Sequence, residues 1–144
     1  MIPLIDLHIH STFSDGKCHP KQIISFAWQK GLHCLAFTDH AFNTELSLNE
    51  DTIENYLDEI SLLKESSPLK ILTGIEAELA TLEKVIQYRD RLDLILLSNH
   101  GPVNGGLFGS IFEAIADYPV DIIAHPWYFS NSSWDKLIQA SLDY

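Results

Sequence analysis

Five short apolar runs alternate with helical patterns along the 144 residues of this chain. The runs span residues 2–9, 34–38, 70–75, 92–98 and 120–124, and Leu, Ile and Val dominate them. They show little polar alternation away from their ends, which is typical of strands buried on both faces of a parallel sheet. We therefore expect an α/β fold of five β/α units in sequence, joined by right-handed crossovers.

Helical patterns fill the intervals between and after these runs, at residues 19–31, 47–67, 81–89, 107–119 and 132–144. Pro20 stands in the first turn of the first pattern, and Gly31 provides a stop at its end. Ser47 and Glu50 have the spacing of a capping box, which predicts that the second helix begins there. No linker, repeat or low-complexity segment interrupts the alternation, so we expect a single domain over residues 1–144.

The charge balance and the cysteines narrow the class of protein. The net charge is −11, with 20 acidic residues against nine Lys and Arg, and the basic residues form no cluster. We therefore expect neither stable nucleic-acid binding nor attachment to a membrane surface. Cys18 and Cys34 form neither a CxxC motif nor a secreted disulfide framework, and no signal peptide or membrane span is evident. These features predict a cytoplasmic protein.

Potential metal ligands stand at the carboxyl end of every expected strand. In chain order they are His8, His10, His40, Glu76, His100 and His125. In parallel α/β folds the loops converge at this end of the strands, and active sites are built there. Each residue alone fits an ordinary turn or a half-buried strand end. Five such coincidences at five strand ends favour a metal centre.

The first strand carries its polar residues at alternating positions. Asp6, His8 and His10 are separated by Leu7 and Ile9. Because side chains alternate along a strand, we expect the three polar residues to point inward and the two aliphatic residues to pack against helices. Asp6 lies deeper than the histidines, so we expect its carboxylate to orient one imidazole through a hydrogen bond.

Two further acids belong to the expected site. Asp15 lies in the loop beyond the first strand, where Gly16 permits a tight turn that folds the carboxylate back toward the histidines. Asp39 directly precedes His40, and we expect it to support the site from behind, the alternative being a turn cap.

The remaining histidines fail the positional test. His19 precedes a helix and His33 opens a strand, so both lie away from the ligand-bearing ends and are expected to be structural. Glu78 shares a strand face with Glu76 and is expected either to support a ligand or to be solvated.

The segments "DLHIHSTFSDG", "TDH", "GIEAE", "SNH" and "AHP" carry a resemblance that covers about residues 6–126. In this order and spacing the chain resembles the PHP family, named for polymerase and histidinol phosphatase domains. The resemblance implies a distorted (β/α)7 TIM-like barrel, of which about five of the seven units are present. It also implies up to three divalent metal ions at the carboxyl ends of the strands.

The resemblance assigns the ligands in three sets. His8, His10 and Glu76 would hold the first metal; Glu76, His100 and His125 the second; and Asp15 and His40 the third. Such an imidazole-rich set suits Zn, Mn or Fe better than Ca or Mg. The family continues through two further units to an Asp-x-His motif that completes the first and third sets. This motif is missing here, so we expect a domain truncated at its C-terminus, with fewer metals, held in the order second, first, third.

The implied function is hydrolysis of a phosphate ester by a metal-bound hydroxide, with a small phosphorylated metabolite or nucleotide as substrate. The candidate catalytic residues are Glu76, as bridging ligand, and His40, as proton donor to the leaving group; a metal-bound water is the alternative donor. Two other functions stay open: an exonuclease-like phosphodiesterase acting on oligonucleotide ends, and a non-catalytic metal-binding remnant. We also expect an oligomer or a partner to cover the open edges of the partial barrel.

Overall fold

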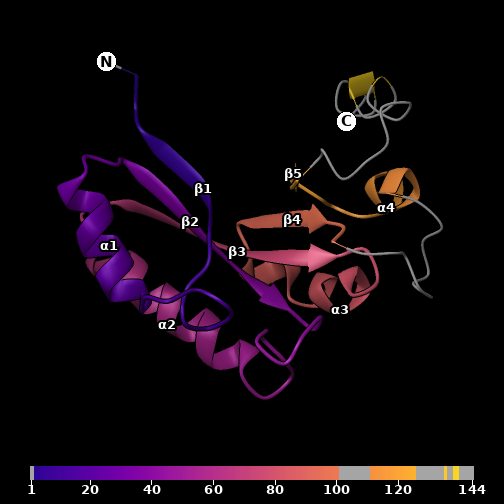
Figure 1. Ribbon diagram of the computed structural model, residues 1–144, viewed down its shortest axis with the longest axis horizontal. Coiled ribbons are helices and arrows are strands. Elements are labelled where there is room, and N and C mark those ends of the chain that lie inside the picture. The colour runs from indigo at the N-terminus through magenta and orange to yellow at the C-terminus, as the bar shows by residue number, and fades with distance from the viewer. Residues whose placement is uncertain (1, 101–110, 126–134, 136–137, 140–144) are drawn as a thin grey trace.

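Five parallel strands form one curled sheet in a computed structural model that describes residues 2–100, 111–125, 135, 138 and 139 (Figure 1). The strands are β1 (Ile5–Ile9), β2 (Cys34–Ala41), β3 (Lys70–Glu78), β4 (Leu94–Ser98) and β5 (Ile122–Ile123). Their order in the sheet is β1-β2-β3-β4-β5, so each strand pairs with its successor in the chain. All carboxyl ends therefore lie at the same edge, and the predicted partial TIM-like barrel is confirmed.

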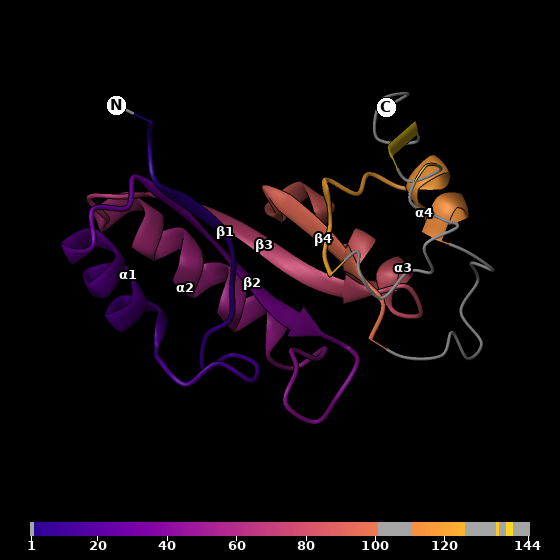
Figure 2. The same ribbon diagram turned by 45° about the horizontal axis from the view of Figure 1, so that its top comes forward.

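The helices follow the strands as expected. They are α1 (Pro20–Gln29), α2 (Ile53–Ser66), α3 (Leu82–Ile86) and α4 (Ile111–Asp117), with a short 3-10 turn at Arg89–Arg91. Figures 1 and 2 show α1 and α2 side by side along one face of the sheet. No helix among the described residues is both long and apolar enough to cross a membrane. The helix predicted at residues 132–144 lies largely outside the described residues.

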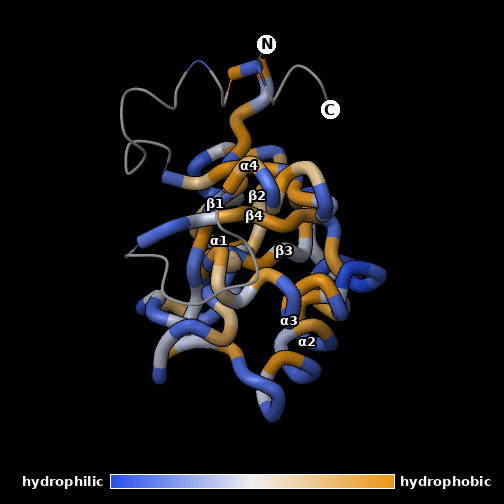
Figure 3. The backbone as a smooth tube through the Cα atoms, turned by 90° about the vertical axis from the view of Figure 1, so that its right-hand side faces the viewer, coloured by the Kyte–Doolittle hydropathy of each residue, from blue (hydrophilic) through white to orange (hydrophobic). Residues whose placement is uncertain are grey.

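The core lies between the central strands and α2. Phe37, Ile75 and Leu97 are fully buried, and they pack in one cluster with Tyr56 of α2. The Tyr56 hydroxyl lies 3.0 Å from the carbonyl oxygen of Phe37 and 2.7 Å from that of Gly74, which ties the helix to two strands. Figure 3 shows hydrophobic stretches concentrated in the strands and polar stretches in peripheral loops. Residues between the core positions point to the opposite, concave face.

The first helix begins and ends as predicted. His19 is its N-cap: the ring accepts a hydrogen bond from the backbone N–H of Lys21, while the Gln22 side chain accepts one from the His19 N–H. These bonds satisfy N–H groups that the first turn leaves free, so the structural role of His19 is confirmed. Gly31 follows the helix with a φ of 78°, a left-handed conformation that glycine adopts without strain.

The second helix begins later than predicted. It starts at Ile53, so the expected capping box of Ser47 and Glu50 is wrong. The Ser47 hydroxyl instead accepts hydrogen bonds from the backbone N–H groups of Asn43 and Thr44, which fold the preceding residues into a compact loop.

The amino-terminal edge of the sheet is closed by side chains that accept backbone hydrogen bonds. His33 Nδ1 accepts from the N–H of the residue before β1, which confirms its structural role. Asp93 accepts from the N–H of Thr73 at 2.7 Å, and Asp121 accepts from that of Ile95 at 2.8 Å. In each case a residue just ahead of one strand satisfies a donor of its neighbour.

Two central strands run further than the apolar pattern indicates. The expected ends were residues 38 and 75, but β2 continues to Ala41 and β3 to Glu78. His40 and Glu76 are therefore held within the sheet, paired in register with each other. Backbone hydrogen bonds, rather than a loop, fix these two candidate ligands.

Candidate metal centre

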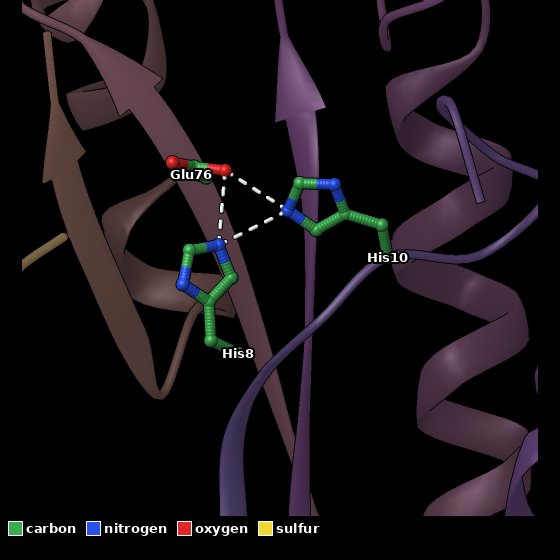
Figure 4. A group of neighbouring side chains, drawn as sticks. All are labelled: His8, His10 and Glu76. Carbon is green, nitrogen blue, oxygen red and sulfur yellow. Dashed lines mark hydrogen bonds and ion pairs between the residues drawn. The ribbon is translucent and has the colours of Figure 1, made fainter. Parts of the chain in front are cut away.

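The carboxylate of Glu76 is the centre of the candidate site. Its side chain is fully buried, although an isolated buried carboxylate is costly. Figure 4 shows the rings of His8 and His10 directed at it, with Oε2 3.0 Å from His8 Nε2 and 2.9 Å from His10 Nε2. The two ring nitrogens are themselves 3.1 Å apart. Three potential ligand atoms thus converge on one point.

Three more imidazoles reach the same carboxylate from the other strands. His40 Nδ1 of β2 lies 3.3 Å from Glu76 Oε2. His125, which follows β5, places Nε2 3.1 Å from Oε1, and His100, which follows β4, lies 3.9 Å from it. The structure therefore brings together all the candidate ligands that the sequence places at strand ends.

Asp15 joins the cluster through the loop after β1. Its Oδ1 is 2.7 Å from His10 Nδ1, and its Oδ2 is 4.0 Å from His40 Nε2. Gly16 makes this return possible, because a Cβ at residue 16 would lie 2.3 Å from the carbonyl oxygen of His10. A contact that short is forbidden for any side chain. The tight turn expected at this glycine is present.

Asp39 supports the site by holding that same loop. It is fully buried and accepts hydrogen bonds from the N–H and the hydroxyl of Ser11, at 2.8 and 2.9 Å, and from the hydroxyl of Ser14 at 2.7 Å. These bonds fix the backbone between His10 and Asp15. The two serines were missed by the sequence reasoning, although Ser11 directly follows the His-x-His pair and Ser14 directly precedes Asp15, which are usable signals.

Glu78 orients His100. Its Oε1 lies 2.5 Å from His100 Nδ1 and accepts a bond from the Ser98 hydroxyl at 3.0 Å. A carboxylate on one ring nitrogen fixes the ring and turns the other nitrogen toward a metal position. Of the two roles expected for Glu78, the structure therefore favours support of a ligand.

Asp6 forms a different bond from the one expected of it. Its carboxylate accepts a hydrogen bond from the backbone N–H of His8, at 3.2 Å, and bonds with no imidazole ring among the residues that the structure describes. The pairing of β1 with β2 is irregular between Asp6 and Ile9, so simple alternation fails there. As a result Asp6 and Ile9 line the same cavity beside α1, away from the histidines.

The contacts within the cluster set the protonation of its members. Burial disfavours the charged form of His10, but bonds with Glu76 and Asp15 outweigh it and raise the His10 pKa to about 9. Burial also opposes ionisation of Glu76, yet its bonds with His10 and His8 hold the pKa of this carboxyl well below its ordinary value. For His40, burial dominates and lowers the pKa, which favours the neutral imidazole. Glu76 is therefore held as a carboxylate and His40 as a neutral imidazole, the forms in which these two groups bind a metal ion.

These residues fit divalent metal ions. The structure forms three overlapping groups whose ligand atoms lie within 4.8 Å of one another: His8, His10 and Glu76; His10, Asp15 and His40; and Glu76, His100 and His125. Glu76 Oε1 and His40 Nδ1 are buried and lack a hydrogen-bond partner of good geometry. Buried polar atoms without partners are rare, and metal coordination would satisfy both. The groups of His8, His10 and Glu76 and of Glu76, His100 and His125 match the sets predicted for the first and second metals. The set predicted for the third metal, Asp15 and His40, gains His10.

Comparison with known proteins identifies the family. The model of the PHP domain matches residues 6–141, so the chain belongs to the PHP domain family. The DNA polymerase/3′-5′ exonuclease PolX of Bacillus subtilis is 29% identical over 131 residues, covering 84% of this chain and 23% of that protein. A 5′-3′ exoribonuclease of Haemophilus influenzae is 34% identical over 71 residues, covering 49% of this chain and 22% of that protein.

A solved structure supports the fold. A Listeria monocytogenes protein named as a histidinol phosphatase superposes with a TM-score of 0.59 at 17% identity, covering 67% of this chain and 44% of that one. The chain spans less than a quarter of the length of each of the two curated relatives. The predicted family is confirmed, while the activities in these names belong to the relatives.

Proposed function

We propose that this chain is a metal-dependent phosphoesterase that hydrolyses a small phosphorylated metabolite or nucleotide. One observation carries the proposal: a single buried carboxylate, Glu76, shared by two groups of potential metal ligands. A bridging carboxylate is the usual way to hold two ions close enough to act on one phosphoryl group. Membership in the PHP domain family supports the same chemistry.

Each residue of the cluster has a proposed role in holding metal ions or in positioning the residues that hold them. Glu76, His100 and His125 would hold one ion, His8 and His10 would hold a second with Glu76, and Asp15 and His40 would hold a third with His10. Such ions supply the activation of water and the neutralisation of phosphoryl oxygens. Glu78 and Asp39 keep His100 and the Asp15 loop in position. His40 as proton donor to the leaving group stays a prediction.

The names of the two curated relatives favour a second candidate, an exonuclease-like phosphodiesterase acting on nucleic-acid ends. It would use the same cluster, because hydrolysis of a diester and of a monoester both require stabilised phosphoryl oxygens. The two candidates differ in what surrounds the phosphoryl group.

The test is a substrate screen of the purified chain in the presence of Mn²⁺ or Zn²⁺. We expect release of inorganic phosphate from small phosphomonoesters, abolished by a chelator and by Glu76→Gln. Activity on oligonucleotide ends alone would overturn the proposal in favour of the phosphodiesterase. Tight metal binding without turnover of either class would identify a non-catalytic remnant.

The cytoplasmic location expected from the sequence stays a prediction, and so does the oligomer or partner expected to cover the open edges of the sheet.

A further inference from the structure

A cavity of about 600 Å³ opens beside the candidate metal cluster. Its lining includes the candidate ligands Asp15, His40 and His100, together with residues of the loop after β2, among them Asn43, Glu45 and Leu46. If a phosphoryl group is held at the cluster, as the proposed function requires, the rest of the substrate has this space to occupy.

The loop that forms the outer wall is tied to the sheet. The backbone N–H of Leu48 donates to the carbonyl of His40 at 2.8 Å, so the loop returns to the end of β2. Inside the loop, the Ser47 hydroxyl accepts from the N–H groups of Asn43 and Thr44 at 3.2 and 3.1 Å. These bonds fix the backbone on both sides of Glu45, so the wall is formed before a ligand enters.

The cavity is acidic. Three carboxylates line it, Asp15, Glu45 and Glu78, and no Lys or Arg is found among the described residues that do so. Asp15 bonds with His10, and Glu78 with His100, so both already face imidazoles. Glu45 is exposed and forms no ion pair with any described residue.

The two described lysines nearest to the cavity in the sequence do not line it. Lys84 lies near the loop, but its ammonium binds Glu50 at 3.0 Å and sits over the ring of Phe42. Lys17, in the loop after β1, is exposed and does not line the cavity. The segments 101–110 and 126–134, which follow β4 and β5, contain no Lys or Arg in their sequences.

We infer that this cavity receives the leaving group of a phosphate monoester, that it selects cationic or uncharged groups over anionic ones, and that Glu45 contributes to this choice. The inference rests on the proposed function for the position of the phosphoryl group. A carboxylate or second phosphate placed beside the loop, beyond the metal positions, would face Glu45, and none of the described Lys or Arg residues lines the cavity to offset that charge. A nucleic-acid strand would place several phosphates near the same wall, where binding ordinarily relies on Lys and Arg.

Binding of three phosphonates that cannot be hydrolysed tests the inference without turnover. In the presence of Mn²⁺, calorimetry would compare 2-aminoethylphosphonate, propylphosphonate and 3-phosphonopropionate, which differ mainly in the charge at the far end. We expect the cationic compound to bind about tenfold more tightly than the anionic one, with the neutral one between them. Equal affinities, or tighter binding of the anionic compound, would overturn the inference.

Substitutions at the loop locate the effect. Glu45→Gln should reduce the ratio of cationic to anionic affinity about threefold, and Glu45→Lys should bring it to one or below. Glu65→Gln, which removes an exposed acid on α2, is the matched control and should leave the ratio unchanged. If both Glu45 variants keep the affinity ratio of the native chain and unfold at the same temperature, the assignment of Glu45 is contradicted.

The binding selectivity and the proposed hydrolytic activity can fail independently of each other. If the phosphonates bind in the expected order but no phosphomonoester is hydrolysed, the selectivity stands and the proposed activity fails. If monoesters are hydrolysed but a 5′-phosphorylated dinucleotide competes better than the cationic phosphonate, the activity stands and the selectivity is overturned.

Discussion

Acidic side chains have different roles at the two edges of the sheet. At the amino-terminal edge each acid meets a backbone donor and a cation: Asp93 binds the Thr73 N–H and Lys64, and Asp121 binds the Ile95 N–H and Arg89. At the carboxyl-terminal edge the buried carboxylate of Glu76 instead forms its ion pairs with imidazoles, among the residues that the structure describes.

This difference shows why residue type does not by itself mark a site. An acid whose bonds are completed by backbone N–H groups and a Lys or Arg is structural, since nothing is left for a ligand to supply. Glu76 and His40 instead keep buried atoms without hydrogen-bond partners. The satisfied edge should govern folding stability, and the unsatisfied edge should govern metal binding.

The largest effect is expected at the shared carboxylate. Glu76→Gln removes the charge that two ligand groups share, so metal affinity should fall at least about 100-fold. Elemental analysis after dialysis and calorimetric titration with Mn²⁺ would measure it. Glu65→Gln serves as the control for loss of one acidic residue. Unchanged metal content in the Glu76 variant would remove the basis of the proposed centre.

A smaller contrast is expected within the cluster. His125→Ala should lose more metal than Asp15→Ala, because His125 reaches the buried Glu76, whereas the Asp15 side chain is 51% exposed and more strongly screened. Elemental analysis of both variants after dialysis decides the ranking. Equal losses would contradict the expected order of occupancy, in which the group of Glu76, His100 and His125 fills first.

A still smaller effect is expected behind the ligands. Asp39→Asn keeps the size of the side chain but weakens its bonds with Ser11 and Ser14, so the Asp15 loop should be held less well. We expect metal affinity to fall about tenfold, as for other groups that orient metal ligands. Asp58→Asn, an exposed acid on α2, is the control, and equal affinities in the two variants would show that the loop holds its position without Asp39.

The smallest effect is expected at the amino-terminal edge. Asp93→Asn should lower the free energy of unfolding by about 1 kcal/mol at neutral pH and leave metal content unchanged. Burial opposes ionisation of Asp93, but its bonds with Lys64 and Thr73 prevail and lower its pKa.

The sign of its pH dependence follows from that direction. A carboxyl whose pKa is lower in the folded state stabilises the fold above its unfolded pKa, and this contribution is lost as the pH falls. Urea unfolding between about pH 6 and pH 3 should therefore show the difference between the native chain and Asp93→Asn shrinking with acid. A constant or growing difference would mean that Asp93 does not act through its charge.

Much of the fold and of the candidate metal centre could be predicted from the sequence, because strand ends and ligand types are local features. Five apolar runs, each followed by His or Glu, were sufficient to place the ligands at one edge. The orientation of Asp6 could not be predicted, because the irregular pairing of β1 breaks the alternation of side chains. The start of α2 was missed because the Ser47 hydroxyl serves its own loop rather than the helix. Both depend on contacts that the sequence pattern does not contain.

The strand order has a consequence for how the chain folds. Since each strand pairs with its neighbour in sequence, the sheet can grow one unit at a time, without inserting a late strand between two early ones. The cluster is different, because His8 precedes β2 and His125 follows β5, and the contact of both with Glu76 needs every strand in place. High-affinity metal uptake during refolding should therefore lag behind helix formation, and its rate would time the docking of the last strand.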